Sequence, residues 1–328
     1  MISRKLTSKF IALCVGLFCI FIAYNSNSNK TYNVTGKAYG TSWSVVSTSF
    51  IADHHEKNII KIIEHIDLVA SNYKNNSEIA IINQQPIDVE ISISEDLFNI
   101  LDIADDVNRL SNGAYNIMLG KISSKFGFAP DFDMSLRQDN NNEYLLINKN
   151  KLVKKSTNWF DLSSIAKGYA VQLIHQYLIE NNIKNHLIDV GGELIVSGSN
   201  FSKPWSVGIQ DPNSFNKKAI HVIKNNNNFL AIATSGEYRN FKYVDGILLT
   251  HTINPSTNKS IKNKLKSVSV VSTVSADIAD AYATALNVMG LSSAMDFADK
   301  NEIAALFIVD RDGSEKIIKS KKWYDLKL

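Results

Sequence analysis

The stretch HLIDVGGELIVSG, residues 186–198, reads as two strands that are joined by the pair Gly191-Gly192. Both halves are rich in Leu, Ile and Val and are about five residues long, which is typical of strands. Because so short a connection cannot hold a crossover helix, the two strands are expected to pair antiparallel. The glycine pair is usually just a turn, although glycine also lets a ring system lie against the backbone.

Further apolar segments predict more strands on both sides of this pair. They are residues 32–50, which form two strands around Gly40, residues 205–210, 228–234, 247–253 and 266–272, and a hairpin over 305–320 that turns at Asp312-Gly313. Helical spacing predicts helices over 56–71, 94–113, 161–182, 276–290 and 292–300. Residues 113–128 read as a glycine-punctuated loop and 139–150 as an asparagine-rich surface excursion. The sum is an α+β fold, a mostly antiparallel sheet with packed helices, in one domain over residues 30–328.

Residues 1–29 predict an export signal or a short membrane anchor. Three basic residues precede an unbroken apolar run over residues 10–23, and a polar tract follows it. The run is shorter than the usual spanning helix of about 20 residues, and no small-x-small cleavage site follows, so a cleaved signal and a retained anchor both stay open. Cys14 and Cys19 lie in this run, but bulky Leu13 and Phe18 precede them where a lipoprotein signal would need a small residue. The remainder is expected on the periplasmic side of a bacterial inner membrane.

The charge balance argues against a nucleic-acid partner. The formal net charge is +3, but residues 1–29 carry three of the 35 basic residues and no acid, which leaves 32 against 32. A chain that is neutral and has no basic stripe lacks the electrostatic footprint of a nucleic-acid-binding protein. The sequence also lacks a GxGxxG after a strand, a P-loop, HExxH and GxSxG, so the common dinucleotide, NTPase, zincin and hydrolase classes lose their usual support.

The helix predicted over 161–182 starts with DLSSIAKG, an unusual set of polar residues ahead of an apolar stripe. One interpretation is structural: Asp161 or Ser163 caps the helix, Lys167 is solvated and Gly168 permits close packing. The other is functional: unpaired N–H groups at the helix start bind an anion such as pyrophosphate, and Lys167 adds a cation. The residues alone leave both open.

The helix over 276–290 carries Asp277, Asp280 and Thr284 on one face near its start. Acids in a first turn commonly complement the helix dipole, which accounts for Asp277. Asp280 lies among alanines that imply burial, and a buried carboxylate needs a partner. A hard cation that takes a carboxylate, a hydroxyl and a main-chain oxygen would satisfy it, and Mg²⁺ fits this description.

Two loops that follow strands carry further candidate side chains. His251 is placed to take a proton near neutral pH, although a lone histidine is more often structural. Ser235, Glu237 and Arg239 come together after another strand, where they serve either loop hydrogen bonds or a ligand.

Taken in order, nine segments of the chain resemble the ApbE family of FAD:protein FMN transferases. They are YGTSWSV, SNYKNNSEIAIIN, GAYNIMLGKISSKFGF, DLSSIAKGYAV, LIDVGGELIVSG, WSVGIQDP, ATSGEYRNF, THTINPSTN and ADAYATALNVMG. The resemblance implies a Mg²⁺-dependent enzyme that cuts the pyrophosphate of FAD, releases AMP and leaves FMN on a threonine hydroxyl of an acceptor protein. The acceptors that it implies are subunits of the Na⁺-pumping NADH:quinone oxidoreductase or of Rnf-type complexes.

The resemblance also implies roles for individual residues. It places the metal ligands on Asp280, Thr284 and the main-chain oxygen of Ser164, and the base that deprotonates the acceptor on His251. It places FAD contacts on Tyr39, Tyr73, Ala114, Tyr115, Asn116, Asp161, Lys167 and Ile253.

Several positions depart from the family pattern. Tyr39 stands for a common methionine, Asn116, Glu237 and Asn254 for aspartates, and Asn258 for the glycine of a turn. Asparagine tolerates the left-handed conformation best among non-glycine residues, so Asn258 can serve that turn. Two other functions stay open: a Mg²⁺-dependent FAD pyrophosphatase that uses water as the acceptor, and a flavin-binding protein without activity.

Overall fold

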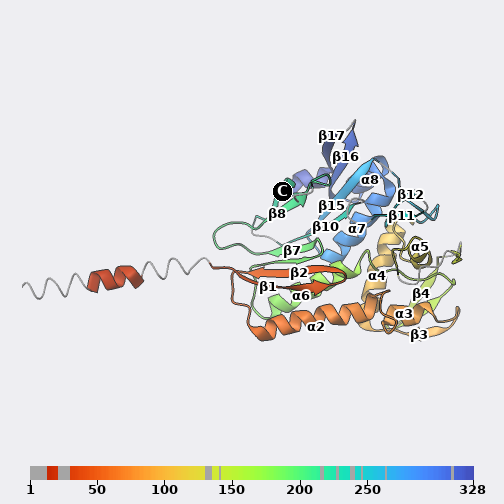
Figure 1. Cartoon of the computed structure of the whole chain (residues 1–328), viewed down its shortest axis with the longest axis horizontal. Coiled ribbons are helices and arrows are strands. Elements are labelled where there is room, and N and C mark those ends of the chain that lie inside the picture. The colour runs from red at the N-terminus through yellow and green to blue at the C-terminus, as the bar shows by residue number, and fades with distance from the viewer. Residues whose placement is uncertain are drawn as a thin grey trace, which may run out of the picture.

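The computed structural model describes residues 13–20, 30–129, 135–139, 142–214, 218–226, 229–236, 241–244, 247–262, 264–311 and 314–328. Its centre is a sheet of eight strands in the order β1-β2-β6-β7-β10-β15-β16-β17, and every neighbouring pair is antiparallel (Figure 1). These strands are β1 Tyr32–Ala38, β2 Thr41–Ser47, β6 His186–Val190, β7 Glu193–Ser197, β10 Leu230–Gly236, β15 Leu265–Ser272, β16 Ala304–Arg311 and β17 Ser314–Lys319. The predicted α+β class and the antiparallel sheet are confirmed.

Helices and small sheets surround this centre. The helices are α2 Asp53–Ala70, α3 Glu78–Asn83, α4 Glu95–Leu110, α5 Gly120–Lys125, α6 Ala166–Glu180, α7 Ala276–Met289, α8 Leu291–Lys300 and α9 Lys321–Asp325. The small sheets are β3 Glu90–Ser92 with β5 Lys151–Lys154 and β4 Tyr144–Ile147, β8 Ser206–Gln210 with β9 Ala219–Lys224, β11 Phe241–Val244 with β12 Ile247–Thr250, and β13 Ile253–Asn254 with β14 Lys259–Ser260.

The two faces of the central sheet are covered differently, as the alternation along β16 shows. Ala305, Phe307 and Val309 pack against α2, α6, α7 and α8, whereas Ala304, Leu306 and Ile308 pack against the β8–β9 hairpin and α9. Successive side chains of a strand point to opposite faces, so a continuous apolar run fits a sheet that is covered on both sides. The central sheet is therefore the middle layer of the protein.

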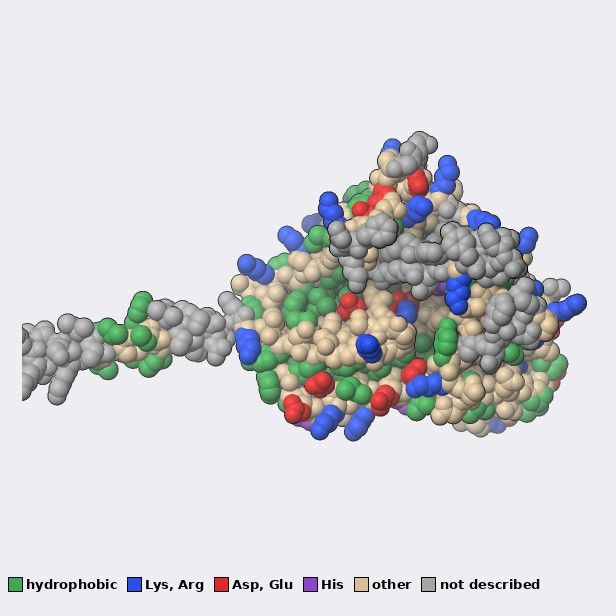
Figure 2. All heavy atoms as spheres, viewed as in Figure 1, with side chains coloured by type: hydrophobic (Ala, Val, Ile, Leu, Met, Phe, Trp, Pro, Cys, Tyr) green, Lys and Arg blue, Asp and Glu red, His purple; other side chains and the backbone are tan. Residues whose placement is uncertain are grey.

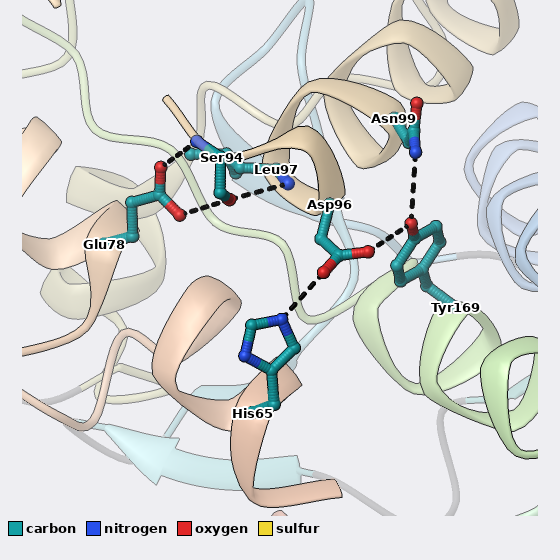
Figure 3. Close-up of polar contacts among 7 residues, drawn as sticks. All are labelled: His65, Glu78, Ser94, Asp96, Leu97, Asn99 and Tyr169. Carbon is teal, nitrogen blue, oxygen red and sulfur yellow. Dashed lines mark hydrogen bonds and ion pairs between the residues drawn. The ribbon is translucent and has the colours of Figure 1, made fainter. Parts of the chain in front are cut away.

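A second core lies among α2, α4, α6 and the small sheet β3–β5–β4, and polar contacts link its helices (Figure 3). Asp96 of α4 accepts a hydrogen bond from the Tyr169 hydroxyl of α6 at 2.8 Å, and its other oxygen lies 2.7 Å from Nε2 of His65 on α2. Glu78 of α3 accepts hydrogen bonds from the amide and hydroxyl of Ser94, the N-cap residue of α4. The Ser94 hydroxyl in turn accepts from the Leu97 amide and so caps α4.

Several predicted boundaries are wrong. The helix predicted from Asp161 begins at Ala166, because residues 163–165 form a turn instead. The predicted loop over 113–128 contains the short helix α5, and the predicted excursion over 139–150 contains β4. Strands β3, β5 and β9 have no counterpart in the prediction. Such short segments form because partners elsewhere in the chain supply their hydrogen bonds.

The amino-terminal segment is only partly described. Residues 13–20 are helical and exposed, whereas residues 1–12 and 21–29 lie outside the described residues. Among the described helices, none combines the length and the apolar content that crossing a membrane requires. The signal or anchor stays a prediction. The turn at Asp312-Gly313 is also outside the described residues, although β16 and β17 pair as that hairpin requires.

His175 of α6 and His186 of β6 are joined by a hydrogen bond between their rings. Nδ1 of His175 lies 2.9 Å from Nε2 of His186, whose Nδ1 lies 2.7 Å from the carbonyl oxygen of Ile183. Burial lowers the pKa of each histidine to about 4. Both side chains are therefore neutral in the folded protein near pH 7.

Acidification should destabilise the protein through this pair. Because the folded-state pKa values lie below the unfolded value of about 6.5, the unfolded chain binds more protons between those pH values. The contribution of the pair is therefore present above pH 6.5 and is lost as the pH falls toward 4. We expect the stability difference between wild type and His175→Gln to shrink by about 1 kcal/mol from pH 7 to 5, less than the full shift because His175 is partly screened by solvent. Denaturant titrations at each pH measure it, with exposed His54→Gln as the control. Parallel pH profiles for wild type and His175→Gln would contradict the expectation.

Candidate active site

A cavity of about 410 Å³ lies where the β1–β2 turn, the start of α6, the β6–β7 turn, the end of β10 and helix α7 converge. Ten of the twelve residues to which the family resemblance assigns a role line it: Tyr39, Ala114, Asn116, Asp161, Ser164, Lys167, His251, Ile253, Asp280 and Thr284. These positions span more than two thirds of the chain. The fold therefore gathers the predicted residues around one cavity.

Backbone geometry shapes two walls of this cavity. The β1–β2 turn uses left-handed conformations at Tyr39 (φ 51°) and Gly40 (φ 72°), and the Tyr39 hydroxyl donates to the carbonyl oxygen of Ile63 on α2 at 2.8 Å. Gly191 in the β6–β7 turn has φ 65°, and a Cβ there would lie 2.6 Å from Thr41 Cγ2. Glycine is the residue that such a conformation and such a close approach require.

The first N–H groups of helix α6 are bonded to acceptors within the protein, one of which is the Asp280 carboxylate. The Gly168 N–H donates to Oδ2 of Asp280 at 3.1 Å, and the N–H groups of Ile165 and Ala166 donate to the carbonyl oxygen of Leu162. The expectation that the N–H groups of this helix start bind an external anion is wrong for these three, since they already have acceptors. The expected cap is also absent: Oδ1 of Asp161 accepts from the Ser163 amide, and no side chain caps the helix.

Gly168 is needed because α6 and α7 approach each other closely. A Cβ at this position would lie 2.6 Å from the Ala276 carbonyl oxygen and 2.8 Å from Asp277 Cα. The structural interpretation of Gly168 is therefore confirmed. Asp277 is buried and accepts from the Ser275 hydroxyl and the Ile278 amide, so it serves the start of α7.

Lys167 is paired with a carboxylate that the sequence gives no role. Its Nζ lies 2.6 Å from Oε1 of Glu193, whose side chain is only 5% exposed. Burial raises the pKa of the Glu193 carboxyl to about 7, although Lys167 opposes the shift. Burial also raises the pKa of Asp280, against the opposing effects of Lys167 and the Gly168 amide. The interpretation of Lys167 as a solvated side chain is wrong.

The residues at this end of the cavity suit a hard divalent cation. Asp280 supplies a buried carboxylate, Thr284 a hydroxyl one turn later, and Ser164 a main-chain oxygen in the turn before α6. The Ser164 hydroxyl donates to the buried Tyr115 hydroxyl at 3.1 Å, which leaves its carbonyl as the metal donor that the resemblance implies. Oxygen donors of these kinds are the ligands that Mg²⁺ takes in proteins. The described residues contain no cluster of three His, Cys, Asp or Glu side chains for a metal, so an ion here would need these neutral oxygens and water.

His251 lies at the cavity and is tied to α7 through its neighbour. Nδ2 of the fully buried Asn287 on α7 lies 3.3 Å from the Thr252 hydroxyl and 3.1 Å from the Ser235 hydroxyl at the end of β10. Asn287 is one turn beyond Thr284, so the helix that carries Asp280 also anchors the segment that carries His251. Glu237 and Arg239, which the sequence groups with Ser235, lie outside the described residues.

Two predicted FAD contacts do not line the cavity. The Tyr115 ring is buried in the helical core, where its hydroxyl meets Ser164. Tyr73 is exposed, and its hydroxyl donates to the carbonyl oxygen of Phe128 at 2.6 Å. The Phe128 ring contacts His251 edge to face, with 6.3 Å between ring centroids. Tyr73 thus connects to the cavity through Phe128, and Tyr115 through Ser164.

The departures from the family pattern keep their local roles where the structure describes them. Oδ1 of Asn116 accepts from the Met118 amide at 2.7 Å, and Oδ1 of Asn254 accepts from the Ser256 amide at 2.9 Å, as an aspartate oxygen would. Asn258 has φ 53°, the left-handed conformation expected from its place in the turn. Glu237 lies outside the described residues.

Glu193 and Asn287 are the site residues that sequence reasoning missed. Glu193 lies two residues before buried Ile195 on β7, so both side chains point to the same face. An acid on the buried face of a strand was the available signal. Asn287 follows Asp280 and Thr284 at helical spacing, which places it on the same face. Neither signal names the partner side chain.

Comparison with known proteins identifies the class of protein to which this α+β fold and cavity belong, an enzyme class. The chain matches the ApbE family over residues 39–307 and belongs to this family. It is 31% identical to the FAD:protein FMN transferase of Vibrio cholerae, covering 87% of this chain and 89% of that one. It is 28% identical to the FAD:protein FMN transferase of Haemophilus influenzae, covering 94% of both. The chain is thus a transferase of the ApbE family.

Solved structures agree with the fold. The flavin transferase ApbE from Vibrio cholerae superposes with a TM-score of 0.79 at 28% identity, covering 90% of this chain and 99% of that one. The ApbE protein from Thermotoga maritima gives a TM-score of 0.78 at 24% identity, covering 91% and 100%. The predicted ApbE-like fold is confirmed.

Replacement of Gly168 should damage both stability and the site. A Cβ that collides with backbone atoms of α7 forces the helices apart, so we expect Gly168→Ala to lower the free energy of unfolding by about 1–3 kcal/mol. It should also weaken FAD binding, because the Gly168 amide would move away from Asp280. Thermal unfolding and flavin titration measure the two effects.

Gly208→Ala on β8 is the matched control. Its Cβ would lie 2.9 Å from the Ala219 side chain in the small β8–β9 sheet, away from the cavity. It should affect stability alone. A Gly168→Ala protein with wild-type stability and wild-type FAD affinity would show that the close helix approach is not required.

Proposed function

We propose that this chain transfers FMN from FAD to a threonine hydroxyl of an acceptor protein, with release of AMP and dependence on Mg²⁺. The observation that carries the proposal is the gathering of Asp280, Thr284, Ser164, Lys167 and His251 around one cavity. Transfer of a phosphate-linked group needs oxygen ligands for a cation, a positive charge for the phosphates and a base. Asp280, Thr284 and Ser164 offer the oxygens, Lys167 the ammonium and His251 the base. The activity named for its relatives agrees with this arrangement.

FAD binding is assigned to the walls of the cavity. Ala114, Asn116, Asp161 and Ile253 line it together with Tyr39. Lys167 lines the same cavity beside Glu193, and we assign its ammonium to the pyrophosphate. Tyr73 is connected to this wall only through Phe128, whose carbonyl oxygen it binds and whose ring contacts His251.

The proposed chemistry is one displacement at phosphorus. The threonine oxygen of the acceptor forms a bond to the FMN-side phosphorus, the bond from that phosphorus to the bridging oxygen breaks, and AMP leaves with the bridging oxygen. A hydroxyl is a poor nucleophile until a base takes its proton, and His251 is the side chain assigned to that step. Asp280, Thr284 and Ser164 would hold Mg²⁺. The ion would draw charge from the pyrophosphate oxygens and so stabilise the transition state by several kcal/mol.

Water is the competing acceptor in the same site. If water replaced threonine, the products would be free FMN and AMP, and the protein would be an FAD pyrophosphatase. The decisive experiment incubates the chain without residues 1–29 with FAD, Mg²⁺ and a candidate acceptor. Yellow fluorescence that stays on the denatured acceptor supports transfer, free FMN without labelled acceptor supports hydrolysis, and FAD that stays intact supports a binding protein.

The cellular setting is proposed from the sequence. The basic and apolar residues before residue 30 support export to the periplasmic side of the inner membrane, by a cleaved signal or a retained anchor. Subunits of the Na⁺-pumping NADH:quinone oxidoreductase or of Rnf-type complexes are the acceptors that fit this location. On the face shown in Figure 2, acidic and basic side chains of the described residues are interspersed, without the basic stripe of a nucleic-acid-binding surface.

Asp280→Asn should reduce transfer about 1,000-fold, which corresponds to the several kcal/mol that a metal ion contributes. The amide oxygen can still accept the Gly168 hydrogen bond, so the protein should stay folded. Asp277→Asn is the control, because Asp277 is an equally buried acid of α7 whose contacts are all local. Initial rates of acceptor labelling measure the effect. Full activity of Asp280→Asn at low Mg²⁺ concentration would remove Asp280 from the metal site.

His251→Ala should slow transfer by about 100- to 10,000-fold, the usual contribution of a general base. FAD affinity should change little. Single-turnover labelling and flavin titration separate the two quantities. A collapse of FAD binding with a small change in rate would instead identify His251 as a ligand contact.

A further inference from the structure

Glu193 is a cavity residue to which the proposed reaction gives no task. Its side chain is almost completely buried, Oε1 holds Lys167 at 2.6 Å, and Oε2 is a buried oxygen without a hydrogen-bond partner among the described residues. A buried polar atom left unpaired costs roughly 1–3 kcal/mol. Pairing with Lys167 alone does not explain the group, because a neutral glutamine oxygen at the same place would accept the same hydrogen bond.

The charges around the cavity give Glu193 a different meaning. Among the described residues that line it, the acids, lysines and histidines are Asp161, Glu193, Asp280, Lys167 and His251. Lys167 contacts Glu193 and acts electrostatically on Asp280, so these three side chains form one group of charges. Lys167 can balance only one of the two buried carboxylates beside it. The cavity without a cation is thus negative, and the pyrophosphate of FAD adds two negative charges. Like charges in a site with little water repel strongly.

A divalent cation reverses this balance. With the ion in place, Asp280 and Glu193 together offset its two charges, and Lys167 remains as a net positive charge for the phosphates. Without the charge of Glu193, Lys167 and Asp280 balance each other, so the pyrophosphate would meet a neutral group here before the ion binds; Asp161 adds the same charge in both cases. Neutralising Glu193, while Asp280 and Lys167 keep their charges, therefore separates these two cases.

We propose that Glu193 makes the binding of the flavin dinucleotide depend on the divalent cation, by keeping the phosphate end of the cavity negative until the ion is bound. The inference rests on the proposed function, because it takes the cation and FAD as the ligands of the cavity. It adds cooperativity between the two ligands: each one strengthens the binding of the other, and binding of FAD without the ion is disfavoured. By linkage, the factor by which the ion tightens FAD binding equals the factor by which FAD tightens ion binding.

The test compares wild type with Glu193→Gln, which keeps the volume and the oxygen that Lys167 needs. FAD dissociation constants are measured by quenching of flavin fluorescence at pH 8, in EDTA and in MgCl₂, without acceptor and with AMP release monitored. At this pH a carboxyl with a pKa of about 7 is ionised. For wild type we expect FAD to bind at least about tenfold more tightly with Mg²⁺ than in EDTA.

For Glu193→Gln we expect FAD binding in EDTA to tighten by about tenfold, and Mg²⁺ binding to the flavin-free protein to weaken by a similar factor. A merely structural residue would not move the two affinities in opposite directions. Lys167→Gln is the opposing variant: it removes the ammonium, so FAD binding in EDTA should weaken further.

Two results would overturn the inference. One is that wild type binds FAD equally tightly in EDTA and in Mg²⁺; this measurement does not depend on the folding of any variant. The other is Glu193→Gln binding FAD in EDTA no more tightly than wild type does. Wild type that labels an acceptor yet shows either result leaves the proposed function standing, whereas wild type that binds no FAD under either condition removes both proposals.

Discussion

The close contact of helices α6 and α7 is the constraint on which the site depends. Gly168 lets the α6 backbone lie against Ala276 and Asp277, and its N–H donates to the Asp280 carboxylate. The alanines along α7 serve the same end, because small side chains allow α7 to pack against both α6 and the central sheet. One helix start thus fixes one buried acid, and that acid defines the end of the cavity suited to a cation.

The central sheet then places everything else relative to this contact. Turns at the ends of β1 and β6 and the last residues of β10 supply the opposite walls, so parts of the chain far apart in sequence meet at one end of a rigid layer. Asn287 extends the control of α7 to Ser235 and Thr252, and so to the backbone beside His251. In the proposed reaction, the cation site and the base are thus positioned by a single helix, which limits the error in their relative placement.

Electrostatics and packing are coupled in this arrangement. Burial raises the pKa of both Asp280 and Glu193, and Lys167 beside them opposes the shift. Two buried acids that share one ammonium are a strained combination in a closed pocket. If the pocket binds a divalent ion and a pyrophosphate, as we propose, the added charges offset this combination.

The sequence by itself determined the antiparallel sheet, most long helices and the family, because periodicity, glycine turns and ordered motifs are local features. Through the family resemblance it also nominated Asp280, Thr284, Lys167 and His251 as site residues, whereas the residues alone left structural roles open for Lys167 and His251. Only the tertiary structure decided that α6 begins at Ala166, that its first N–H groups serve Leu162 and Asp280, and that Lys167 is paired with Glu193. These facts are contacts between segments distant in sequence, and hydrogen bonding and burial across such distances leave no periodic trace in either segment alone.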